Sequence, residues 1–408
     1  MRRVVVTGMA GLCALGSDWP TIEAGLRRRG NAVRQMPEWD CYKDLGTRLA
    51  APIADFEPPA HWTRKQLRSM GRVSQLSVRA AELALTDAGL LGDPLLRRGG
   101  VGVACGSSVG STADVGDFAQ MLRTGDSPGL NANSYVRMMP HTTCANIGIF
   151  FGLTGRIIST STACTSGSQG VGFAYEAIRQ GKQTVMLGGG ADELCPSEAM
   201  AFDILFATCR RNDEPSSNPR PYDRDRDGLV VGEGAGMLVL EEYEHAQARG
   251  ARIYAEVVGF ATNSDGAHVT RPEKETMRQV MELALLDAGL PPSAIGYVNG
   301  HGTATEHGDI AETRATAALF GSGIPLSSQK SYLGHTLGAC GALESMFSIE
   351  MMRSGWFAPT MNLDNVDPRC GELDYIVGDG RPLEVEYVMN NNFAFGGVNT
   401  SLIFRRCP

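Results

Sequence analysis

The sequence contains no long apolar run and no excess of basic residues. A transmembrane helix needs about 20 consecutive apolar residues, whereas the apolar start Val4–Val6 is interrupted by Thr7 and Gly8. The 37 Lys and Arg residues are outnumbered by 45 Asp and Glu residues, which gives a formal net charge of −8. We therefore expect a chain that does not enter a membrane, is not exported and does not bind nucleic acid through its overall charge.

Motifs for disulfides, metals and nucleotides are also missing. The ten cysteines are spread over 408 residues without a CxxC pair, so neither a disulfide framework nor a zinc knuckle is expected. There is no HExxH motif, and the glycine clusters at 188–190 and 232–236 lack the flanking pattern of a dinucleotide site. The sequence thus predicts a cytoplasmic protein with no catalytic metal and no tightly bound cofactor.

Glycine, in contrast, is abundant. It contributes 50 of 408 residues, or about 12% against a usual ~7%, without the Gly-X-Y repeat of collagen, so we expect it in tight turns and close backbone contacts. Helical patterns at 77–88 and 168–180 each end at a glycine, which is typical of helix termination. They alternate with β-branched runs that predict buried strands, and the fold class is therefore α/β. The predicted strands lie at 4–6, 101–104, 185–187, 237–240 and 255–258.

One pattern occurs twice, 200 residues apart. The sequence ELALxDAGL stands at residues 82–90 and again at 282–290. Each copy precedes a predicted strand that ends in a polar turn containing glycine, at 101–107 and 295–301. The order, the spacing and the following turn indicate two similar halves. The alternative is chance recurrence of an alanine-rich amphipathic helix closed by glycine.

Cys164 is the best candidate for a nucleophile. It lies in the run of small residues 159–167, between a short strand and the helix that begins near Ser168. Backbone N–H groups and the helix dipole at such a position favour a thiolate, and small neighbours leave space for a substrate. We interpret six of the other cysteines as small buried side chains: Cys13, Cys41, Cys105, Cys209, Cys370 and Cys407.

Two histidines lie in glycine-rich turns, which is where an imidazole can face a cavity. His301 stands in the turn 299–305 and His335 in the turn 330–336. Near the end of the chain, the glycine-containing segment 390–399 is predicted to be a loop whose backbone N–H groups bind an oxyanion. The remaining candidates are interpreted as structural: His61, His141, His245 and His307, with Glu306, His307 and Asp309 forming a poor zinc pattern.

These motifs together resemble one enzyme family. The segments TACTSG at 162–167, GHGT at 300–303, KSYLGH at 330–335 and FGG at 395–397 are similar to the β-ketoacyl-[acyl carrier protein] synthases, most of all to the elongating ketosynthase II type. The resemblance implies the thiolase fold, a duplicated αβαβα sandwich of five layers, which would explain the repeat. The two halves would be residues 1–250 and 251–408 in one interlocked unit, and the protein would be a dimer.

The resemblance also implies a reaction. Cys164 would take an acyl group from a carrier-protein thioester, and His301 and His335 would stabilise the enolate formed when malonyl loses carbon dioxide. Attack on the Cys164 thioester would yield a 3-oxoacyl product two carbons longer. The resemblance implies further roles. The backbone N–H groups of Cys164 and Phe395 would form an oxyanion hole, and Lys330 would be catalytic together with the buried acid Glu344. Thr303 and Thr305 would contact phosphopantetheine, Phe395 would act as the gate, and Asp309 would be structural.

The sequence departs from the family at the gate and at the carrier-protein surface. Ala394 occupies a position before the gate that is usually glycine, which would restrict the loop and bears on substrate binding. Phe206 stands where the family often has arginine, although a basic docking patch is retained. The alanine at position 394 and the asparagine-rich segment before it resemble the ketosynthases of aryl-polyene pigment clusters. The residues of the expected docking patch are Arg64, Lys65 and Arg68.

Three alternatives stay open at this point. The chain could be an aryl-polyene ketosynthase that works as a heterodimer with a ketosynthase-like subunit, or a non-catalytic chain-length partner. Such partners commonly replace the nucleophile, so the presence of Cys164 favours an enzyme. A degradative thiolase would need a second active-site cysteine, for which Cys340 is the nearest candidate, but the motif around His335 favours decarboxylative condensation.

Overall fold

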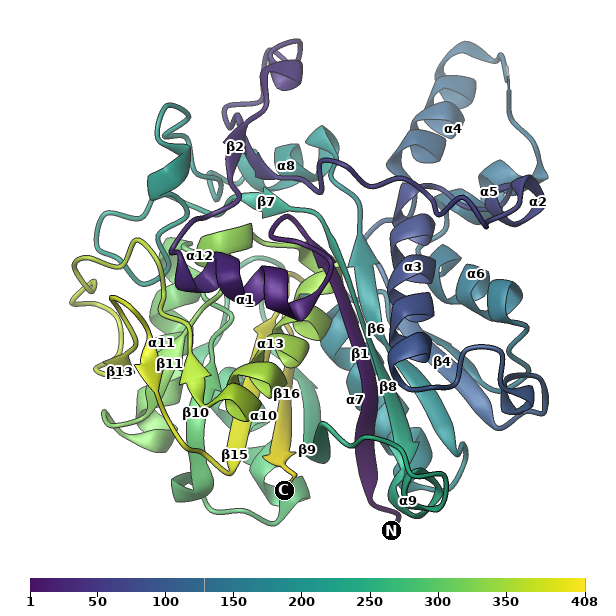
Figure 1. The fold of residues 1–408 in the computed structure, drawn as a ribbon. Helices are drawn as coiled ribbons and strands as arrows, with labels where there is room; N and C mark the ends of the chain where they lie inside the picture. Colours follow the sequence, from purple (N-terminus) through teal and green to yellow (C-terminus); the bar gives the residue numbers. More distant parts are fainter. Residues whose placement is uncertain (128, 408) are drawn as a thin grey trace.

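Eleven strands form one continuous mixed sheet that runs through both halves of the molecule (Figure 1). The computed structural model describes residues 1–127 and 129–407. The strand order is β13-β11-β10-β15-β16-β9-β1-β8-β6-β4-β5. The halves join where β1 pairs antiparallel with β9, with Val4 opposite Val257 and Val6 opposite Ala255.

The two halves repeat the same order of elements. In the first half the strands lie as β5-β4-β6-β8-β1, and in the second as β11-β10-β15-β16-β9, so each position has a counterpart. The duplication predicted from the repeated sequence pattern is thereby confirmed. The first half contains β1 (Val4–Cys13), α3 (Arg72–Asp87), β4 (Val101–Gly106), α6 (Thr142–Phe151), β5 (Ile157–Ser159), α7 (Ser166–Arg179), β6 (Val185–Asp192) and β8 (Gly234–Glu242). The second contains β9 (Ala255–Ser264), α10 (Lys274–Ala288), β10 (Ile295–Asn299), α11 (Glu306–Phe320), β11 (Pro325–Ser327), α13 (Cys340–Ser354), β15 (Tyr387–Phe393) and β16 (Val398–Arg406).

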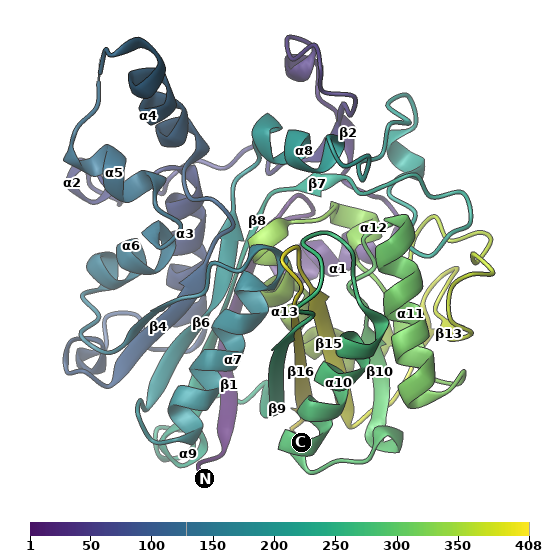
Figure 2. The same ribbon diagram turned by 180° about the vertical axis from the view of Figure 1, so that it is seen from behind.

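Helices α7 and α13 lie between the two parts of the sheet, in the middle of the molecule. Figure 2 shows α3 and α6 on one outer side and α10 and α11 on the other, which gives the five layers of the thiolase fold. The two central helices approach closely because their first turns carry glycine. A Cβ added at Gly167 would lie 2.8 Å from the carbonyl oxygen of Gly338, and one added at Gly341 would lie 2.6 Å from the nitrogen of Ser168.

The remaining elements lie outside the two repeated sets of strands and helices. A three-stranded sheet of order β2-β3-β7 and a pair β12-β14 supplement the main sheet. Among residues 1–127 and 129–407, no helix is both long enough and apolar enough to span a bilayer. These additional elements are α1 (Trp19–Arg27), β2 (Arg34–Gln35), β3 (Leu49–Ala51), α2 (Arg64–Leu67), α4 (Thr112–Thr124), α5 (Ala132–Met138), α8 (Pro196–Asp203), β7 (Val231–Gly232), α9 (Tyr243–Ala248), α12 (Lys330–Leu333), β12 (Trp356–Phe357), β13 (Asp374–Tyr375) and β14 (Arg381–Pro382).

The predicted strands and helices are confirmed, and one predicted loop is wrong. Asn390, Asn391 and Asn392 lie within β15, Asn399 lies within β16, and only residues 394–397 turn between these strands. Burial in a central strand is compatible with the side chains of Asn390 and Asn392 because they form hydrogen bonds to side chains of β10 and α13. Asn299 donates to Asn390 at 2.7 Å, and Asn390 donates to Ser345 at 3.0 Å. The division at residues 250 and 251 stays a prediction.

Candidate active site

Three segments that follow parallel strands of both halves meet at one edge of the sheet. Cys164 follows β5, His301 follows β10 and His335 follows β11 and α12, while the turn with Phe395 follows β15. Strands β4, β5 and β6 are parallel, as are β10, β11 and β15, so these segments all leave the sheet at carboxyl ends. This edge is where ligands bind in many α/β proteins.

Cys164 lies in a 3₁₀ turn, η3 (Ala163–Thr165), directly before α7. The residue that precedes it, Ala163, has a φ of +51°, which is unusual for a residue with a side chain. The same strain occurs beside both histidines, at Ala304 with φ +64° and at Leu337 with φ +49°. Strained backbone of this kind is typical of functional sites, because the surrounding structure must hold it in place.

His335 contacts the thiol directly. Its Nε2 lies 3.0 Å from the Cys164 Sγ, and its Nδ1 accepts the backbone N–H of Leu337 at 3.1 Å. Because Nδ1 is an acceptor, the hydrogen-bond network assigns the imidazole proton to Nε2, which donates toward the sulfur. Cys164 and His335 are 4% and 2% exposed, so this contact is shielded from water.

His301 is oriented by a buried ion pair. Lys330 Nζ lies 3.2 Å from His301 Nδ1 and also donates to Glu344 Oε1, while Asn392 donates to Glu344 Oε2 at 2.7 Å. Because the Lys330 ammonium group donates, Nδ1 of His301 accepts, and the proton of the His301 imidazole is on Nε2. The rings of His301 and His335 lie 5.2 Å apart, nearly perpendicular. Both imidazoles can therefore donate from Nε2.

Burial sets the charges of these groups. It lowers the pKa of His301 and of His335 well below the usual value, and the positive charge of Lys330 adds to this effect, so both imidazoles are neutral at pH 7. Burial alone would lower the pKa of Lys330, but Glu344 raises it. Burial also raises the pKa of Glu344 although Lys330 opposes this; the hydrogen bonds to both carboxylate oxygens favour the ionised pair.

The expectation that the elbow favours a thiolate is wrong for the free protein. Burial raises the pKa of the Cys164 thiol to about 11, although Lys330 and the backbone N–H of Phe395 act to lower it. The reason is that the cost of placing a negative charge among buried groups exceeds the attraction of the nearby N–H groups and the ammonium group. The thiol is therefore protonated in the empty site.

The backbone N–H groups of Cys164 and Phe395 both act to lower the pKa of the Cys164 thiol. Their role as an oxyanion hole stays a prediction. Phe395 is held in a turn by Gly396 and Gly397, whose φ angles of +86° and +73° suit glycine. Its ring packs against Phe202 of α8 with a centroid distance of 5.0 Å. The turn therefore carries both the N–H group and the aromatic side chain of the predicted gate.

A cavity of about 450 Å³ leads to the thiol. Thr303 and Thr305 line it, with their hydroxyls 2.9 Å apart, and Ala394 lines it as well. The predicted docking residues do not belong to this cavity. They are exposed on and just after α2, which lies beside α5 in Figures 1 and 2; the residues concerned are Arg64, Lys65 and Arg68.

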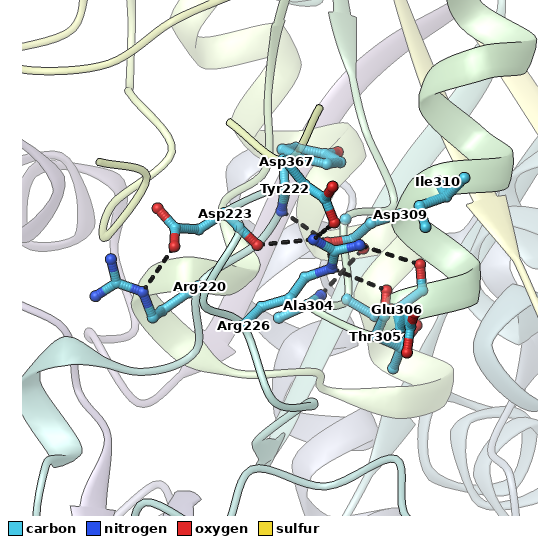
Figure 3. A network of polar contacts seen from close by, with 12 residues as sticks. Arg220, Tyr222, Asp223, Arg226, Ala304, Thr305, Glu306, Asp309, Ile310 and Asp367 are labelled. Atoms are coloured by element: carbon cyan, nitrogen blue, oxygen red, sulfur yellow. Dashed lines mark hydrogen bonds and ion pairs between the residues drawn. The ribbon is translucent and has the colours of Figure 1, made fainter. Parts of the chain in front are cut away.

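A polar network fixes the wall that carries the threonines (Figure 3). The Arg226 guanidinium is 2% exposed and pairs with Asp309 and Asp367, at 3.4 and 2.8 Å. Arg226 also donates to the backbone oxygen of Thr305 at 3.3 Å, and Asp309 accepts the N–H of Ala304 at 3.1 Å. This geometry agrees with the structural role expected for Asp309.

Comparison with known proteins decides the family. The pattern of the β-ketoacyl synthase N-terminal domain matches residues 1–246, and that of the C-terminal domain matches residues 254–364. The chain belongs to the β-ketoacyl synthase family. It is 38% identical to 3-oxoacyl-[acyl-carrier-protein] synthase 2 of Vibrio cholerae, over 99% of both chains.

Solved structures of β-ketoacyl synthases agree with this assignment. A β-ketoacyl synthase from Burkholderia phymatum is 60% identical, with a TM-score of 0.99 over 100% of both chains. The ishigamide ketosynthase/chain length factor is 33% identical, with a TM-score of 0.90 over 100% of both chains. The thiolase fold and the family resemblance predicted from the sequence are thereby confirmed.

Some residues of this β-ketoacyl synthase site were not predicted from the sequence. Glu312 accepts the backbone N–H groups of His301 and Gly302 and so holds the histidine turn. Asn392 orients Glu344, and Phe202 stacks on the gate. Helical spacing from Asp309 to Glu312, both on α11 and both buried, was the one available signal for Glu312. Nothing in the local sequence distinguishes Phe202 from an ordinary core residue.

The thiol and the two imidazoles also form a potential metal-binding group. The ligand atoms of Cys164, His301 and His335 all lie within 4.8 Å of one another. The Lys330 ammonium group, 3.2 Å from His301, opposes the binding of a second cation at this place. The absence of a catalytic metal stays a prediction.

Proposed function

We propose that this β-ketoacyl synthase condenses an acyl group held on Cys164 with malonyl-[acyl carrier protein], which gives a 3-oxoacyl-[acyl carrier protein]. The observation that carries the proposal is the convergence of one thiol and two neutral imidazoles, each with Nε2 available to donate, in one buried cavity. The family membership and the relative named 3-oxoacyl-[acyl-carrier-protein] synthase 2 support the same reaction.

The first half-reaction loads the enzyme. The Cys164 thiol loses its proton as its sulfur attacks the carbonyl carbon of an acyl thioester on the carrier. The backbone N–H groups of Cys164 and Phe395 stabilise the tetrahedral oxyanion. The carbon–sulfur bond to phosphopantetheine then breaks, and the phosphopantetheine thiol leaves with a proton. Because burial disfavours the thiolate, its deprotonation is expected to occur with substrate bound, when N–H groups and Lys330 compensate the charge.

The second half-reaction forms the carbon–carbon bond. The malonyl thioester oxygen accepts hydrogen bonds from Nε2 of His301 and of His335, which stabilise the enolate as the carboxylate leaves as carbon dioxide. The enolate carbon attacks the acyl thioester on Cys164. The bond to Sγ breaks, and the cysteine sulfur takes up a proton from solvent, because its own proton left with the phosphopantetheine thiol in the first half-reaction. The 3-oxoacyl chain leaves on the carrier. Neutral imidazoles suit this role because each can donate a hydrogen bond from Nε2 without itself carrying a positive charge.

The substrates would arrive on the phosphopantetheine of acyl carrier protein, with Thr303 and Thr305 contacting that arm and no cofactor bound tightly to the enzyme. The exposed patch of Arg64, Lys65 and Arg68 would attract the acidic carrier. We place this activity in the cytoplasm and in a homodimer, serving chain elongation in fatty acid synthesis.

A specialised pathway is the second candidate. The similarity to a ketosynthase/chain length factor favours a heterodimer in which this chain is the active subunit and elongates a polyketide or polyene, such as an aryl-polyene pigment. A purely non-catalytic partner is disfavoured because Cys164, His301 and His335 are all in place.

The test is a condensation assay with purified enzyme, acyl carrier proteins bearing a range of primers, and malonyl carrier protein, followed by mass spectrometry. We expect a 3-oxoacyl carrier product from at least one primer. If no primer yields product, the proposal is wrong. If product forms only when a ketosynthase-like subunit is added, the heterodimer is favoured over the homodimer.

A further inference from the structure

Three exposed apolar side chains stand at the mouth of the cavity. Leu205 and Phe206, just after α8, are 44% and 80% exposed, and Val269 is 68% exposed. All three line the cavity that leads to Cys164. Because Cys164 is buried at the inner end of this cavity, the three exposed side chains mark its opening to solvent. We call Leu205, Phe206 and Val269 the apolar rim.

The backbone of Phe206 is strained. Its φ angle is +54°, in the left-handed region, which is unfavourable for a residue with a bulky side chain. Burial of the ring within the chain does not offset this cost, since most of the ring surface faces solvent. An exposed aromatic ring on a strained backbone at the mouth of a cavity therefore indicates a contact with another molecule.

The surrounding residues hold the ring in its exposed position. The N–H of Phe206 donates to the backbone oxygen of Asp203 at 3.0 Å, and the N–H of Ala207 donates to that of Phe202 at 3.0 Å. The guanidinium group of Arg210 lies 5.3 Å from the centre of the Phe206 ring. The turn after α8 is thus fixed on both sides of Phe206, and its ring is presented outward.

The arginines that follow Phe206 along the chain are paired with acids. Arg210 lies 3.1 Å from the Asp203 carboxylate, and Arg211 lies 3.9 Å from that of Asp227. These carboxylates offset the positive charges, so this part of the mouth offers apolar surface to a partner instead of free positive charge. It differs in this respect from the basic patch on and just after α2.

The occupant that fits this position is the carrier protein. Its phosphopantetheine arm must pass through the mouth to reach Cys164, so the carrier residues beside the arm have to lie against the apolar rim. Helices α2 and α8 lie at the same end of the molecule in Figures 1 and 2, and one carrier can therefore face both the basic patch and the rim. An apolar rim is matched by an apolar side chain on the carrier.

We propose that Phe206 is a docking residue that packs on an apolar side chain of the acyl carrier protein, beside the attachment point of the phosphopantetheine arm. The proposal rests on the condensing function proposed above and names the chemistry by which this enzyme recognises its carrier. In this arrangement the basic patch attracts the acidic carrier over a distance, and the apolar rim discriminates between carriers on contact.

The experiment measures kcat/KM for condensation on the acylated enzyme with two malonyl donors, malonyl carrier protein and malonyl pantetheine. Only the first presents a protein surface to the rim. Phe206→Asn removes the ring, and asparagine tolerates the left-handed backbone. We expect kcat/KM to fall about tenfold with the carrier protein and to change less than about twofold with malonyl pantetheine. Equal changes with both donors, or no change with either, would overturn the proposal.

Ionic strength separates the apolar contact from the basic patch. The loss in Phe206→Asn should be the same at low and high salt, because salt does not screen an apolar contact, whereas the patch acts most strongly at low salt. Phe206→Leu keeps an apolar side chain and should retain most of the activity with the carrier. Leu286→Asn is the matched control, since Leu286 is 76% exposed on α10, away from the cavity lining. A loss that vanishes at high salt would refute an apolar contact.

Two further measurements identify other roles of the ring. The Tm of Phe206→Asn should be unchanged or higher, because the substitution relieves the backbone strain. A lower Tm with equal losses for both donors would show that the ring only stabilises the turn. A change of oligomeric state by light scattering, without a change in kcat/KM for the carrier, would show that a second copy of this chain covers the rim.

The outcome also separates this inference from the proposed function. If the wild-type enzyme condenses both donors and Phe206→Asn does so equally well, condensation stands and the docking role of Phe206 is refuted. If the wild-type enzyme condenses neither donor with any primer, the proposed function itself fails.

Discussion

The two halves of the molecule build the same elbow at the site, and only one of them carries a nucleophile. The 3₁₀ turn η3 (Ala163–Thr165) precedes α7, and its counterpart η6 (Leu337–Ala339) precedes α13. The first residue of each turn has the same left-handed conformation, with φ of +51° and +49°. The second residue is Cys164 in one half and Gly338 in the other.

The difference follows from what surrounds each turn. A Cβ at Gly338 would lie 2.8 Å from Asp192 Oδ2 and 3.2 Å from the Cα of Ser107, so no side chain fits there. The Gly338 N–H instead holds Asp192. The first half therefore presents the thiol, while the second half supplies the histidines that surround it. The two copies of the duplicated fold therefore contribute different groups to the site, a thiol from the first and imidazoles from the second.

The largest expected effect comes from removing the only thiol placed at an elbow. Cys164→Ala should abolish the acyl-enzyme and lower condensation about 10³-fold or more, because in the described part of the chain Cys164 is the cysteine that lines the cavity. Intact-protein mass after incubation with acyl carrier protein measures the adduct.

The nearest cysteine of the second half, Cys340, provides the control. Cys340 donates from its thiol to the backbone oxygen of Cys164 at 3.2 Å, and its own pKa is raised well above the usual value by burial. Cys340→Ala should retain the adduct. An adduct that persists in Cys164→Ala and disappears in Cys340→Ala would reverse the assignment of the two halves.

The second-largest effect concerns the histidines of the second half. His301→Ala and His335→Ala should each lower condensation about 10²- to 10³-fold, as expected for the loss of one oxyanion donor. Acylation of Cys164 should persist in both variants. Malonyl decarboxylation, measured as carbon dioxide release, should fall in parallel with condensation. Full condensing activity in either variant would show that its imidazole is not one of the donors.

A smaller effect tests why the second elbow lacks a side chain. Gly338→Ala should destabilise the protein by about 1–3 kcal/mol, because the added methyl group contacts Asp192 and the backbone of Ser107. Thermal unfolding measures this. Gly116→Ala on α4 is the matched control; its added Cβ meets nothing within 4 Å, so it should stabilise by about 0.5–1 kcal/mol. Equal Tm values for both variants would contradict the steric explanation.

The smallest effect concerns the segment that follows the first strand of each half. In the second half this segment, 265–273, lines the cavity, whereas in the first half it carries the exposed basic patch on α2. Lys65→Glu with Arg68→Glu should raise KM for the carrier roughly fivefold, and more at low salt. Lys182→Glu, exposed at the opposite end of the sheet, should leave KM unchanged. Equal KM values for the double variant and this control would exclude the patch from docking.

Much of the fold could be predicted because its signals are local. The repeated pattern at 82–90 and 282–290 falls on α3 and α10, which occupy equivalent places in the two halves. The loop predicted at 390–399 was wrong because three asparagines resemble a turn locally, whereas their hydrogen-bond partners on β10 and α13 are distant in sequence.

The site could be predicted in its reacting residues but not in its electrostatics. Cys164 and His335 were identifiable from their motifs, yet the 3.0 Å contact between them joins residues 171 positions apart. The thiol pKa depends on burial by both halves, which is why the expected thiolate was wrong.

The secondary structure, the repeated pattern and the candidate thiol and imidazoles could be predicted from residue patterns, since each pattern is complete within a short stretch of chain. Which nitrogen of each imidazole donates, and whether the thiol is charged, became apparent only from the folded structure. Nδ1 of His335 accepts from Leu337 and Nδ1 of His301 faces Lys330, and these contacts require the folded turns around the site. The charge of the thiol depends on desolvation, which exists only once both halves have packed around Cys164.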